Sequence, residues 1–363
     1  MANNNDKKVL NVPALRFPEF TGEWENITIR EACSEFQSGK NIKAEMINDQ
    51  GLYPVYGGNG LRGFTGSYNH DGDYILIGRQ GALCGNVRKV TGKTYVTEHA
   101  IAVCASKEHE TTFLRHLFQK MRLGQYSDQS AQPGLAVNKL LRLNINVPSK
   151  NEQGKIAKIL SLIDERITTQ NKIIEDLKKL KSAISERLFK SVKGSTVLLS
   201  DLCDIVKGKQ INGENLSDSG NYYVMNGGTE PSGYYDNYNV EASTISISEG
   251  GNSCGYVQFN TSPFWSGGHC YSIQNIADKV DNMYLYHYLK SNEDAIMKLR
   301  IGSGLPNIQK KDLAMFKIIV PKIEWQIKIS TFLSSLERKA EIEERIQNVM
   351  QKQKLYLLQQ MFI

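Results

Sequence analysis

The sequence lacks the features that mark several common classes of protein. No stretch of its 363 residues approaches 18 consecutive apolar residues, so we expect no transmembrane helix. No basic segment followed by an apolar one opens the chain, so no secretory signal is predicted. The six cysteines include no C-x-x-C pair, which argues against a zinc ribbon or a dithiol redox motif. We therefore expect a cytoplasmic protein with reduced thiols.

The residues that are present have the balance of a folded protein. Hydrophobic residues make up 40% and charged residues 23%, which permits a packed core and argues against wholesale disorder. The length predicts about two domains. The formal net charge of +6 permits nucleic-acid binding without requiring it.

The chain contains an internal repeat at an offset of about 170 residues. The segment Tyr53–Phe64 aligns with Tyr223–Tyr234, and both contain a Gly-Gly pair and a later glycine before an aromatic residue. The segment Gly81–Val87 aligns with Gly251–Val257, and each contains a Cys-Gly pair. A single offset, without gaps, aligns many residues of the same specific type in the two copies. The chain is therefore two copies of one unit, each a globular part followed by a helix.

Each globular part is predicted to contain short strands and one helix. Runs of β-branched and aromatic residues between glycines are typical of strands, and Pro148 and Pro321 end the last of them. The expected strands are 73–77, 94–103 and 143–147 in the first copy and 243–247, 264–273 and 316–320 in the second; the expected helices are 113–122 and 283–298.

After each of these prolines the pattern changes to a long helix. Glu152–Leu188 has apolar residues at heptad spacing and predicts a helix roughly 55 Å long. A second helix is expected from about Glu324 to the C-terminus. A long helix with a narrow apolar stripe needs a partner, and the simplest partner is the other copy's helix; the alternative is that each helix packs on its own domain. The expected seam positions are Ile156, Leu160, Ile163, Ile167, Ile174, Leu177, Ile184 and Leu188 in the first helix and Ile329, Leu333, Leu336, Ile342, Ile346 and Val349 in the second.

The predicted fold class is therefore α+β. Two similar α/β domains are separated by two long helices that pair as an antiparallel coiled coil, with the pseudo-two-fold symmetry of an internal repeat. The predicted divisions are an N-terminal tail (1–19), a first domain (20–149), a central helix (150–193), a second domain (194–321) and a C-terminal helix (322–363).

Two similar binding domains held apart by a rigid helical spacer suit a long ligand with a periodic structure, and double-stranded DNA is the obvious example. Base readout needs Arg, Lys, Asn, Gln, Ser or Thr side chains on loops that reach the major groove. The alternative for any one such residue is an ordinary solvated loop position. The candidates are Lys40, Asn59, Arg62, Arg79, Gln80, Asn86, Arg88 and Gln132 in the first copy and Lys209, Thr229, Glu249, Asn252, Ser253 and Asn307 in the second.

Several motifs together resemble a known family. The segment Val12–Phe20, followed by Trp24, resembles the start of many specificity subunits of type I restriction-modification systems. The Gly39-Lys40 and Gly208-Lys209 turns, the Val-Pro sequences before both long helices and the helices themselves are also similar to that family. Each motif is modest alone, but their doubled order is specific and covers essentially the whole chain.

The resemblance implies two target-recognition domains joined by an antiparallel coiled coil. It also implies a complex with two DNA-adenine methyltransferase subunits and, for restriction, with translocating endonuclease subunits. This chain would bind no cofactor itself, because S-adenosylmethionine, ATP and Mg²⁺ would belong to those partners. An asymmetric bipartite DNA target would follow from the unlike copies. Lengthening the first helix by one heptad should then change the spacer between the half-sites and leave both half-sites intact.

No catalytic or metal site is predicted in this chain. Gly251–Gly255 matches the G-x-S-x-G pattern, but a strand-like segment follows it where a hydrolase has a helix. Gly92-Lys93-Thr94 lacks the glycine that a phosphate-binding loop carries five residues earlier. Paired Cys and His residues recur in both copies, and packing roles are expected for them. The remaining rival is a non-enzymatic two-headed adaptor for protein or glycan.

Overall fold

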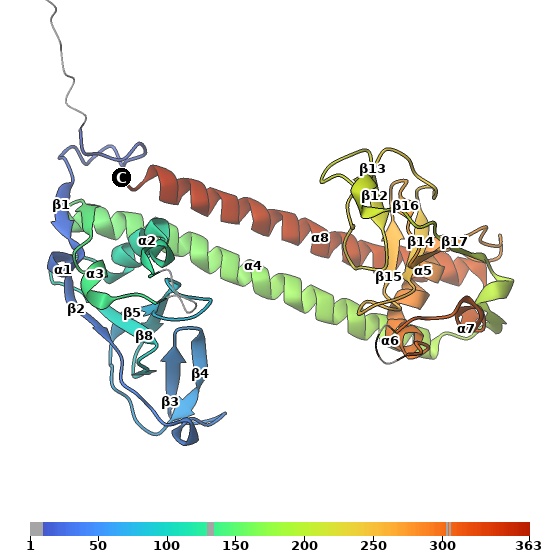
Figure 1. Cartoon of the computed structure of the whole chain (residues 1–363), viewed down its shortest axis with the longest axis horizontal. Helices are drawn as coiled ribbons and strands as arrows, with labels where there is room; N and C mark the ends of the chain where they lie inside the picture. Colours follow the sequence, from blue (N-terminus) through green and yellow to red (C-terminus); the bar gives the residue numbers. More distant parts are fainter. Residues whose placement is uncertain (1–9, 129–133, 303, 305) are drawn as a thin grey trace, which may run out of the picture. The chain divides into compact units, whose positions relative to one another are not determined.

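The computed structural model describes residues 10–128, 134–302, 304 and 306–363. The chain divides into two compact units (Figure 1). Unit 1 comprises Met1–Asn171 with Ile346–Ile363, and unit 2 comprises Lys172–Arg345. The long helices α4 (Lys150–Ser191) and α8 (Ile323–Gln360) each contribute one part to each unit. No helix of the described residues is both long enough and apolar enough to cross a membrane.

Unit 1 is built on an antiparallel four-stranded sheet. Its strand order is β2 (Cys33–Ser38), β8 (Ala100–Ala105), β5 (Asp73–Gly78) and β6 (Val87–Thr91). Residues on one face of the sheet, such as Ile75, are fully buried with α2 (Thr111–Met121) in the main core. Leu76 on the opposite face joins a smaller core. That smaller core lies beside a three-stranded sheet in the order β4 (Gly60–Thr65), β3 (Tyr53–Gly57) and β7 (Tyr95–Val96).

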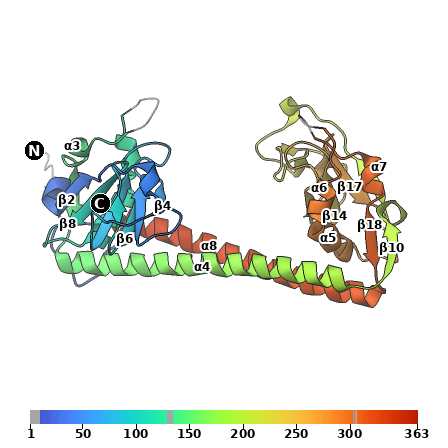
Figure 2. The same ribbon diagram turned by 90° about the horizontal axis from the view of Figure 1, so that it is seen from below.

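Unit 2 repeats this arrangement. Its four-stranded sheet has the order β11 (Asp204–Lys207), β17 (Cys270–Gln274), β14 (Thr244–Ser248) and β15 (Val257–Asn260). Its three-stranded sheet has the order β13 (Tyr234–Tyr235), β12 (Tyr222–Met225) and β16 (Trp265–Ser266). In each unit the sheets stand on one side of the long helices (Figure 2). The matching strand orders confirm the repeat.

A two-stranded antiparallel ribbon completes each unit. β1 (Glu25–Thr28) pairs with β9 (Asn144–Val147), and β10 (Ser195–Leu198) pairs with β18 (Lys317–Val320). β9 and β18 are the expected last strands, and each leads through a proline into a long helix. The remaining elements are α1 (Ile29–Ala32), α3 (Val137–Leu140), α5 (Asn282–Ser291), α6 (Glu293–Met297), α7 (Lys310–Ala314) and 3₁₀ turns at Ala44–Met46, Leu123–Tyr126, Leu199–Asp201 and Gly213–Asn215.

Two predicted elements are each divided in the structure. The expected strand 94–103 is β7 and β8 with a turn between them, and 264–273 is β16 and β17. The turn is needed because β7 pairs in parallel with β3 in one sheet, whereas β8 pairs antiparallel with β2 and β5 in the other. The expected helix 283–298 is likewise α5 and α6, which are separated at Asn292.

Both long helices begin in the same way. The Gln153 side chain donates from Nε2 to the Pro148 carbonyl at 2.8 Å and accepts from the Glu110 backbone N–H at 3.0 Å. The Gln326 side chain makes the same two bonds, to the Pro321 carbonyl at 2.9 Å and from the Asp281 N–H at 2.9 Å. Both glutamines are fully buried. In each case the bonds join the proline before the long helix to the N-cap residue of α2 or α5, and they relate α4 to α8 by 173 positions.

Within each unit the two helices run antiparallel. In unit 1, Lys354 Nζ lies 2.6 Å from Asp164 Oδ1, and Gln347 donates to Asn171. In unit 2, Lys178 pairs with Glu344 and Lys181 with Glu337, both at 2.6 Å. Residue numbers rise along α4 as they fall along α8, so the predicted antiparallel pairing is confirmed.

The expected seam positions of α4 are all shielded. Ile163, Ile167, Ile174 and Leu177 are buried or half-buried along the middle of the helix. The outer positions serve a second purpose, because they pack into the domains. Ile156 and Leu160 belong to the main core of unit 1, and Ile184 and Leu188 pack against the core of unit 2. Packing on the domain and pairing with the other helix therefore both occur.

The seam predicted for α8 is wrong over its second half. Ile329 and Leu333 lie in the core of unit 2, and Leu336 is half-buried as expected. Ile342, Ile346 and Val349, however, are 48%, 40% and 54% exposed. The half-buried positions continue from Leu336 at heptad spacing through Ala340, Glu343, Gln347, Met350, Lys354 and Leu357.

The physical reason is that both ends of α8 are anchored in cores. Leu333 fixes the rotation of the helix in unit 2, and Leu358 fixes it in the core of unit 1. The stripe that carries more polar side chains therefore faces α4, where Glu337 and Lys354 find partners of opposite charge. The more apolar stripe is left facing outward.

Candidate nucleic-acid interface

Three chain segments meet in unit 1, and together they carry Asn59, Arg79, Gln80 and Asn86, which are half of the contact residues predicted for the first copy. They are the turn between β3 and β4, the loop after β5 and the segment before β8. The Arg79 backbone N–H donates to the His99 carbonyl at 2.9 Å. A Cβ added at Gly58 would lie 2.8 Å from the His99 oxygen and 3.4 Å from the Gln80 oxygen. The turn therefore approaches the loop so closely that only glycine fits at position 58.

We call the place where these three segments meet the junction of unit 1, and polar and basic side chains surround it. Gln80 is exposed, and its Oε1 lies 3.0 Å from His99 Nδ1. The Arg88 guanidinium lies across Gly60, since a Cβ added there would be 2.6 Å from Arg88 Nη1. Arg62 is exposed beside Gly57. The group combines guanidinium, amide and imidazole groups, which suit hydrogen bonding to base edges and to phosphate.

The other first-copy candidates lie at different distances from this junction. Asn59 is exposed in the β3–β4 turn itself, and Arg79 is half-buried at the start of the loop. Lys40 is exposed, and its backbone N–H donates to Val96 next to the junction. Asn86 is exposed at the far end of the loop, next to β6. Gln132 lies outside the described residues.

Unit 2 brings the equivalent segments together. The Glu249 N–H donates to the His269 carbonyl at 2.9 Å, and a Cβ added at Gly227 would lie 3.1 Å from His269. Asn307 adds a further strand-like bridge to Gly250. Of the predicted residues here, Lys209, Thr229, Asn252 and Asn307 are exposed and Ser253 is half-buried.

Glu249 differs from the other candidates because it is only 7% exposed. Its Oε1 accepts from Lys207 Nζ at 2.6 Å and from the Tyr271 hydroxyl at 3.0 Å. Burial, together with the charge of Glu249, raises the pKa of Tyr271 well above its ordinary value, so this hydroxyl stays a donor. Oε2 has no hydrogen-bond partner among the described residues, and it lies 3.9 Å from His269 Nδ1. The exposed Lys207 and His269 are therefore held next to a buried carboxylate.

Three residues at the two junctions were not among the contact residues predicted from the sequence. Lys207 precedes the Gly208-Lys209 turn and was a detectable basic residue, but its pairing with Glu249 is long-range. His99 and His269 are repeated in both copies, and that repetition was the available signal. The sequence pattern favoured packing roles for them, whereas their side chains are 46% and 63% exposed.

The repeated cysteines hold the loops in place. Cys254 is fully buried, and its Sγ donates to the Glu249 carbonyl at 3.0 Å. Cys84 contacts the Arg79 carbonyl in the same way at 3.4 Å. Burial raises the pKa of both thiols, which disfavours the reactive thiolate. The segment Gly251–Gly255 continues into the strand β15, which lacks the strand-to-helix turn of a hydrolase nucleophile.

The two junctions thus share a backbone framework and differ in charge. Arg79 in unit 1 and Glu249 in unit 2 occupy equivalent positions, and each donates its backbone N–H to the equivalent histidine carbonyl. Unit 1 presents Arg62 and Arg88 nearby, whereas unit 2 presents amides and a buried carboxylate. Unlike ligand groups are therefore expected at the two places.

Comparison with known proteins places both copies in one family. The model of the family described as type I restriction modification DNA specificity domain matches residues 21–179 and again residues 193–352. The chain is 42% identical over 165 residues to the EcoprrI type I restriction enzyme specificity subunit of Escherichia coli. That match covers 44% of this chain and 40% of the relative's length.

Longer matches extend over most of the chain. A putative type I specificity subunit, S.MgeORF438P of Mycoplasma genitalium, is 22% identical over 345 residues, covering 87% of this chain and 88% of that protein. The crystal structure of an S subunit from M. genitalium has a TM-score of 0.75 at 20% identity and covers 97% of this chain and 99% of that one. The similarity to this crystal structure is a similarity of fold.

Proposed function

Since this chain belongs to the type I restriction-modification DNA specificity family, we propose that it reads an asymmetric two-part DNA target. It also holds the enzymatic subunits of such a system on that target. In this proposal the junction of unit 1 reads one half-site and the junction of unit 2 reads the other. The chain itself contributes recognition and assembly, and the chemistry belongs to its partners.

The observation that carries this proposal is the pair of junctions with one framework and unlike side chains. Equal junctions would favour a palindrome, because two-fold symmetry in a reader matches two-fold symmetry in its target. Arg62, Arg79 and Arg88 suit guanine, whose O6 and N7 are acceptors. In unit 2 the carboxylate of Glu249 is buried and paired with Lys207, so the exposed amides of Asn252 and Asn307 are the groups that suit a base, and adenine offers them an acceptor at N7 and a donor at N6.

The charge of the second domain supports a role for partner proteins. Residues 194–321 contain 13 acidic and 9 basic residues. Phosphate contacts supply most of the non-specific affinity of DNA-binding proteins, and they need basic side chains. We propose that two methyltransferase subunits and, in the restricting complex, endonuclease subunits supply much of that contact. S-adenosylmethionine, ATP and Mg²⁺ are assigned to those subunits, and the complex is placed in the cytoplasm.

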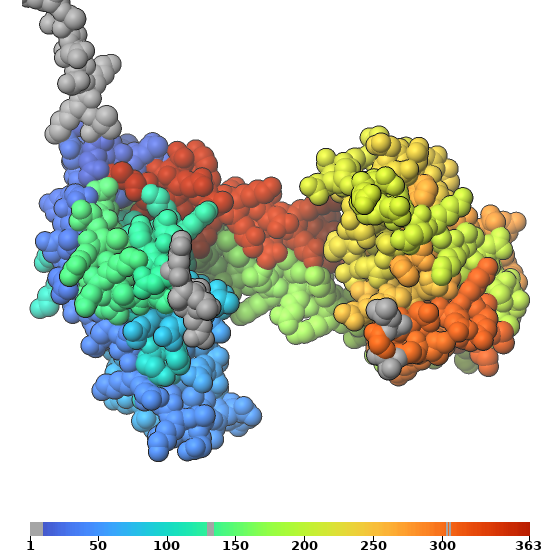
Figure 3. Space-filling model, in the orientation of Figure 1, coloured from blue at the N-terminus to red at the C-terminus, as the bar shows by residue number. Residues whose placement is uncertain are grey.

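An outward apolar stripe on α8 supports binding of a partner. Ile346, Val349 and Tyr356 are 40%, 54% and 58% exposed at heptad-related positions in unit 1. The last two also line a surface pocket with Ile163 and Leu357. The red C-terminal part of α8 stands at the surface of unit 1 in Figure 3. Contiguous exposed apolar residues of this kind are typical of protein interfaces.

Co-expression with a methyltransferase subunit tests the proposal. Host DNA would be sequenced by a single-molecule method that detects N6-methyladenine. We expect a bipartite motif with two unlike halves and an unspecified spacer. The control is the methyltransferase expressed without this chain, which should give no motif. If the pair assembles and binds DNA without preference for sequence, the proposal is wrong.

A further inference from the structure

The starts of α4 and α8 are equivalent, but only one of them is covered. The anchoring residues Gln153 and Gln326 relate the two helices by 173 positions. The same offset relates Lys181 to Lys354, which form the equivalent ion pairs with Glu337 and Asp164. The first turns can therefore be compared residue by residue. Glu152 corresponds to Trp325, Lys155 to Lys328 and Ile159 to Phe332.

In unit 1 the segment Leu10–Trp24 covers the start of α4. Arg16 makes a bidentate pair with Glu152, with both N–O distances at 2.7 Å. The Lys155 ammonium pairs with Glu19 and lies 5.9 Å and 5.5 Å from the ring centres of Phe17 and Phe20.

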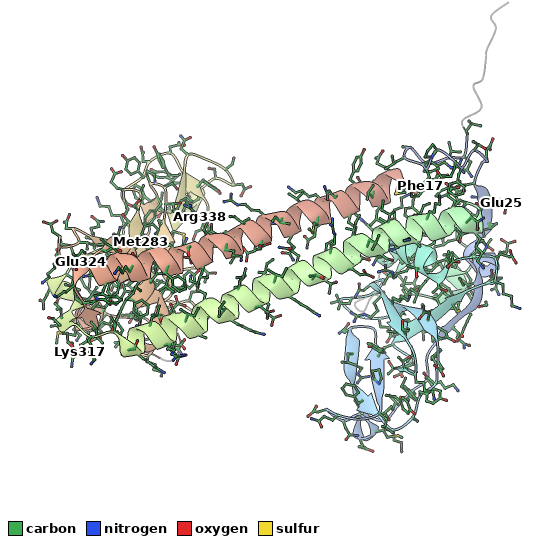
Figure 4. All side chains as sticks on the ribbon, turned by 180° about the vertical axis from the view of Figure 1, so that it is seen from behind. Phe17, Glu25, Met283, Lys317, Glu324 and Arg338 are labelled. Carbon is green, nitrogen blue, oxygen red and sulfur yellow. The ribbon has the colours of Figure 1, made fainter. Side chains whose placement is uncertain are left out.

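This covering segment reaches from the start of α4 to the end of α8. The Leu15 N–H donates to the Gln360 carbonyl at 2.8 Å. Phe17 packs against the main core of unit 1 and lies beside the C-terminal end of α8 in Figure 4. Ile159 of α4 is consequently half-buried and packed against the same core.

Among the residues that the structure describes in unit 2, no segment corresponds to this covering segment. There the end of α4 is joined directly to β10 by the three residues Val192–Gly194. The start of α8 is marked by Glu324 in Figure 4, and the equivalent side chains in its first turns are all exposed. Trp325 is 59% exposed and Phe332 is 46% exposed. Lys328 Nζ lies 5.0 Å from the centre of the Trp325 ring.

We infer that the surface formed by Trp325, Lys328 and Phe332 binds a short aromatic and acidic segment of a partner subunit. This inference rests on the assembly proposed above. The covering segment of unit 1 is the template for the occupant, because an aromatic ring and a carboxylate there meet the equivalent lysine. Trp325 stands where α4 has the charged Glu152, so the occupant needs no cation there and can pack an apolar or aromatic side chain against the indole ring in place of Arg16.

A second copy of this chain is a poorer occupant than another protein. The covering segment of each copy is already held in its own unit 1 by the Arg16–Glu152 pair. Trp24, at its end, is only 3% exposed in the core, where its ring packs edge-on against Phe113. Releasing the segment would expose this ring and leave Glu152, whose side chain is 1% exposed, without its partner.

Photocrosslinking in the assembled complex tests the inference. A benzoylphenylalanine placed at position 325 of the full chain is irradiated in complex with the co-expressed methyltransferase and endonuclease subunits, and crosslinked peptides are identified by mass spectrometry. We expect a crosslink to one segment of a partner subunit that contains an aromatic residue and an Asp or Glu within a few residues. The same probe at Leu52, which is 78% exposed, should give no such crosslink.

Substitutions measure the strength of the contact. Trp325→Glu recreates the residue that α4 has at this place, and it should weaken partner binding at least tenfold, because buried tryptophans at interfaces contribute strongly to affinity. Leu52→Glu is the matched control and should change binding less than twofold. The melting temperature of the free chain should stay within about 1 °C for both, because surface substitutions change stability little.

Two results overturn the inference. One is a crosslink from position 325 to another copy of this chain. The other is the absence of any crosslink in an assembled complex together with unchanged partner affinity of Trp325→Glu. These outcomes are read from assembly and not from methylation. They therefore leave the proposed DNA recognition standing, whereas loss of a sequence-specific methylation motif would overturn that proposal alone.

Discussion

At the scale of single residues, the β6 strand offers two neighbouring cations with different surroundings. Arg88 lies across Gly60 at the junction of unit 1. Lys89 points to the other face of the strand, where its Nζ lies 2.9 Å from Asp73 Oδ2. One cation is thus available to a ligand at the junction, and the other belongs to a surface ion pair.

Arg88→Ala should therefore weaken binding of the native first half-site. A good arginine–guanine contact contributes about 1–3 kcal/mol, which predicts a loss of roughly 10- to 100-fold. The measurement is fluorescence anisotropy of the methyltransferase complex with duplex DNA at fixed salt. Lys89→Ala is the matched control and should stay within twofold. Equal losses for the two variants on specific and on random DNA would show that Arg88 acts only through general charge.

Two buried histidines give the protein an acid-sensitive stability. Burial lowers the pKa of His116 to about 3 and that of His287 to about 4. His116 Nε2 lies 2.8 Å from Arg115 Nη2, and His287 Nε2 lies 2.8 Å from Ser334 Oγ. In the unfolded chain both rings have an ordinary pKa of about 6.5. Below that pH the unfolded state binds protons that the folded state does not bind.

Stability should consequently be level above pH 7 and fall as the pH drops below about 6.5. The expected slope well below that value is about 1.4 kcal/mol per pH unit for each histidine, continuing towards pH 4. Urea unfolding of the full chain between pH 7.5 and 5 measures it. His287→Gln should remove one histidine's share of the slope. A variant whose slope equals that of the parent chain would contradict this assignment.

At the scale of elements, α8 shows that a heptad pattern in the sequence does not by itself decide which face of a helix is buried. The helix carries two stripes at heptad spacing, and the stripe through Ile342, Ile346 and Val349 is the more apolar. Periodicity alone predicts that this stripe is buried. Its rotation is instead fixed by residues held in two cores and by ion pairs such as Lys354 with Asp164. Those contacts are long-range in sequence, so no pattern within the helix reveals them.

The corrected seam predicts which substitutions affect folding. Leu333→Ala, in the core of unit 2, should lower the free energy of unfolding by about 2–5 kcal/mol. Val349→Ala, at a position that is 54% exposed, should change it by less than about 0.5 kcal/mol. Calorimetry of the free chain compares them. A large loss of stability from Val349→Ala would show that Val349 lies in the seam between the helices, as the sequence pattern predicts.

At the scale of the whole molecule, much of the architecture could be predicted because the sequence contains the same unit twice. The repeated Gly-Gly turns and Cys-Gly pairs located the junction segments, and the heptads located both long helices. The ligand-facing details could not be predicted. The role of Glu249 depends on Lys207 and Tyr271, which approach it from two other strands. The bases that each junction reads depend on such loop geometry and not on local pattern.

Exchange of a domain tests the division of labour between the copies. Replacing residues 20–149 with the equivalent domain of a relative should change one half of the methylated motif and leave the other half and the spacer intact. The readout is again single-molecule sequencing of methylated DNA, with the parent chain as control. A change in both halves would show that the two units do not read independently.

The division of the chain into its units has a consequence for the order in which the protein is made. Unit 2 is one continuous stretch, Lys172–Arg345, whereas the core of unit 1 includes Leu358, Met361 and Phe362. The ring of Phe362 packs against Trp24 and Phe113 at centroid distances of 6.4 Å and 5.2 Å. On the ribosome, the unit that begins first therefore completes its core last, after the whole of the second unit has been synthesised.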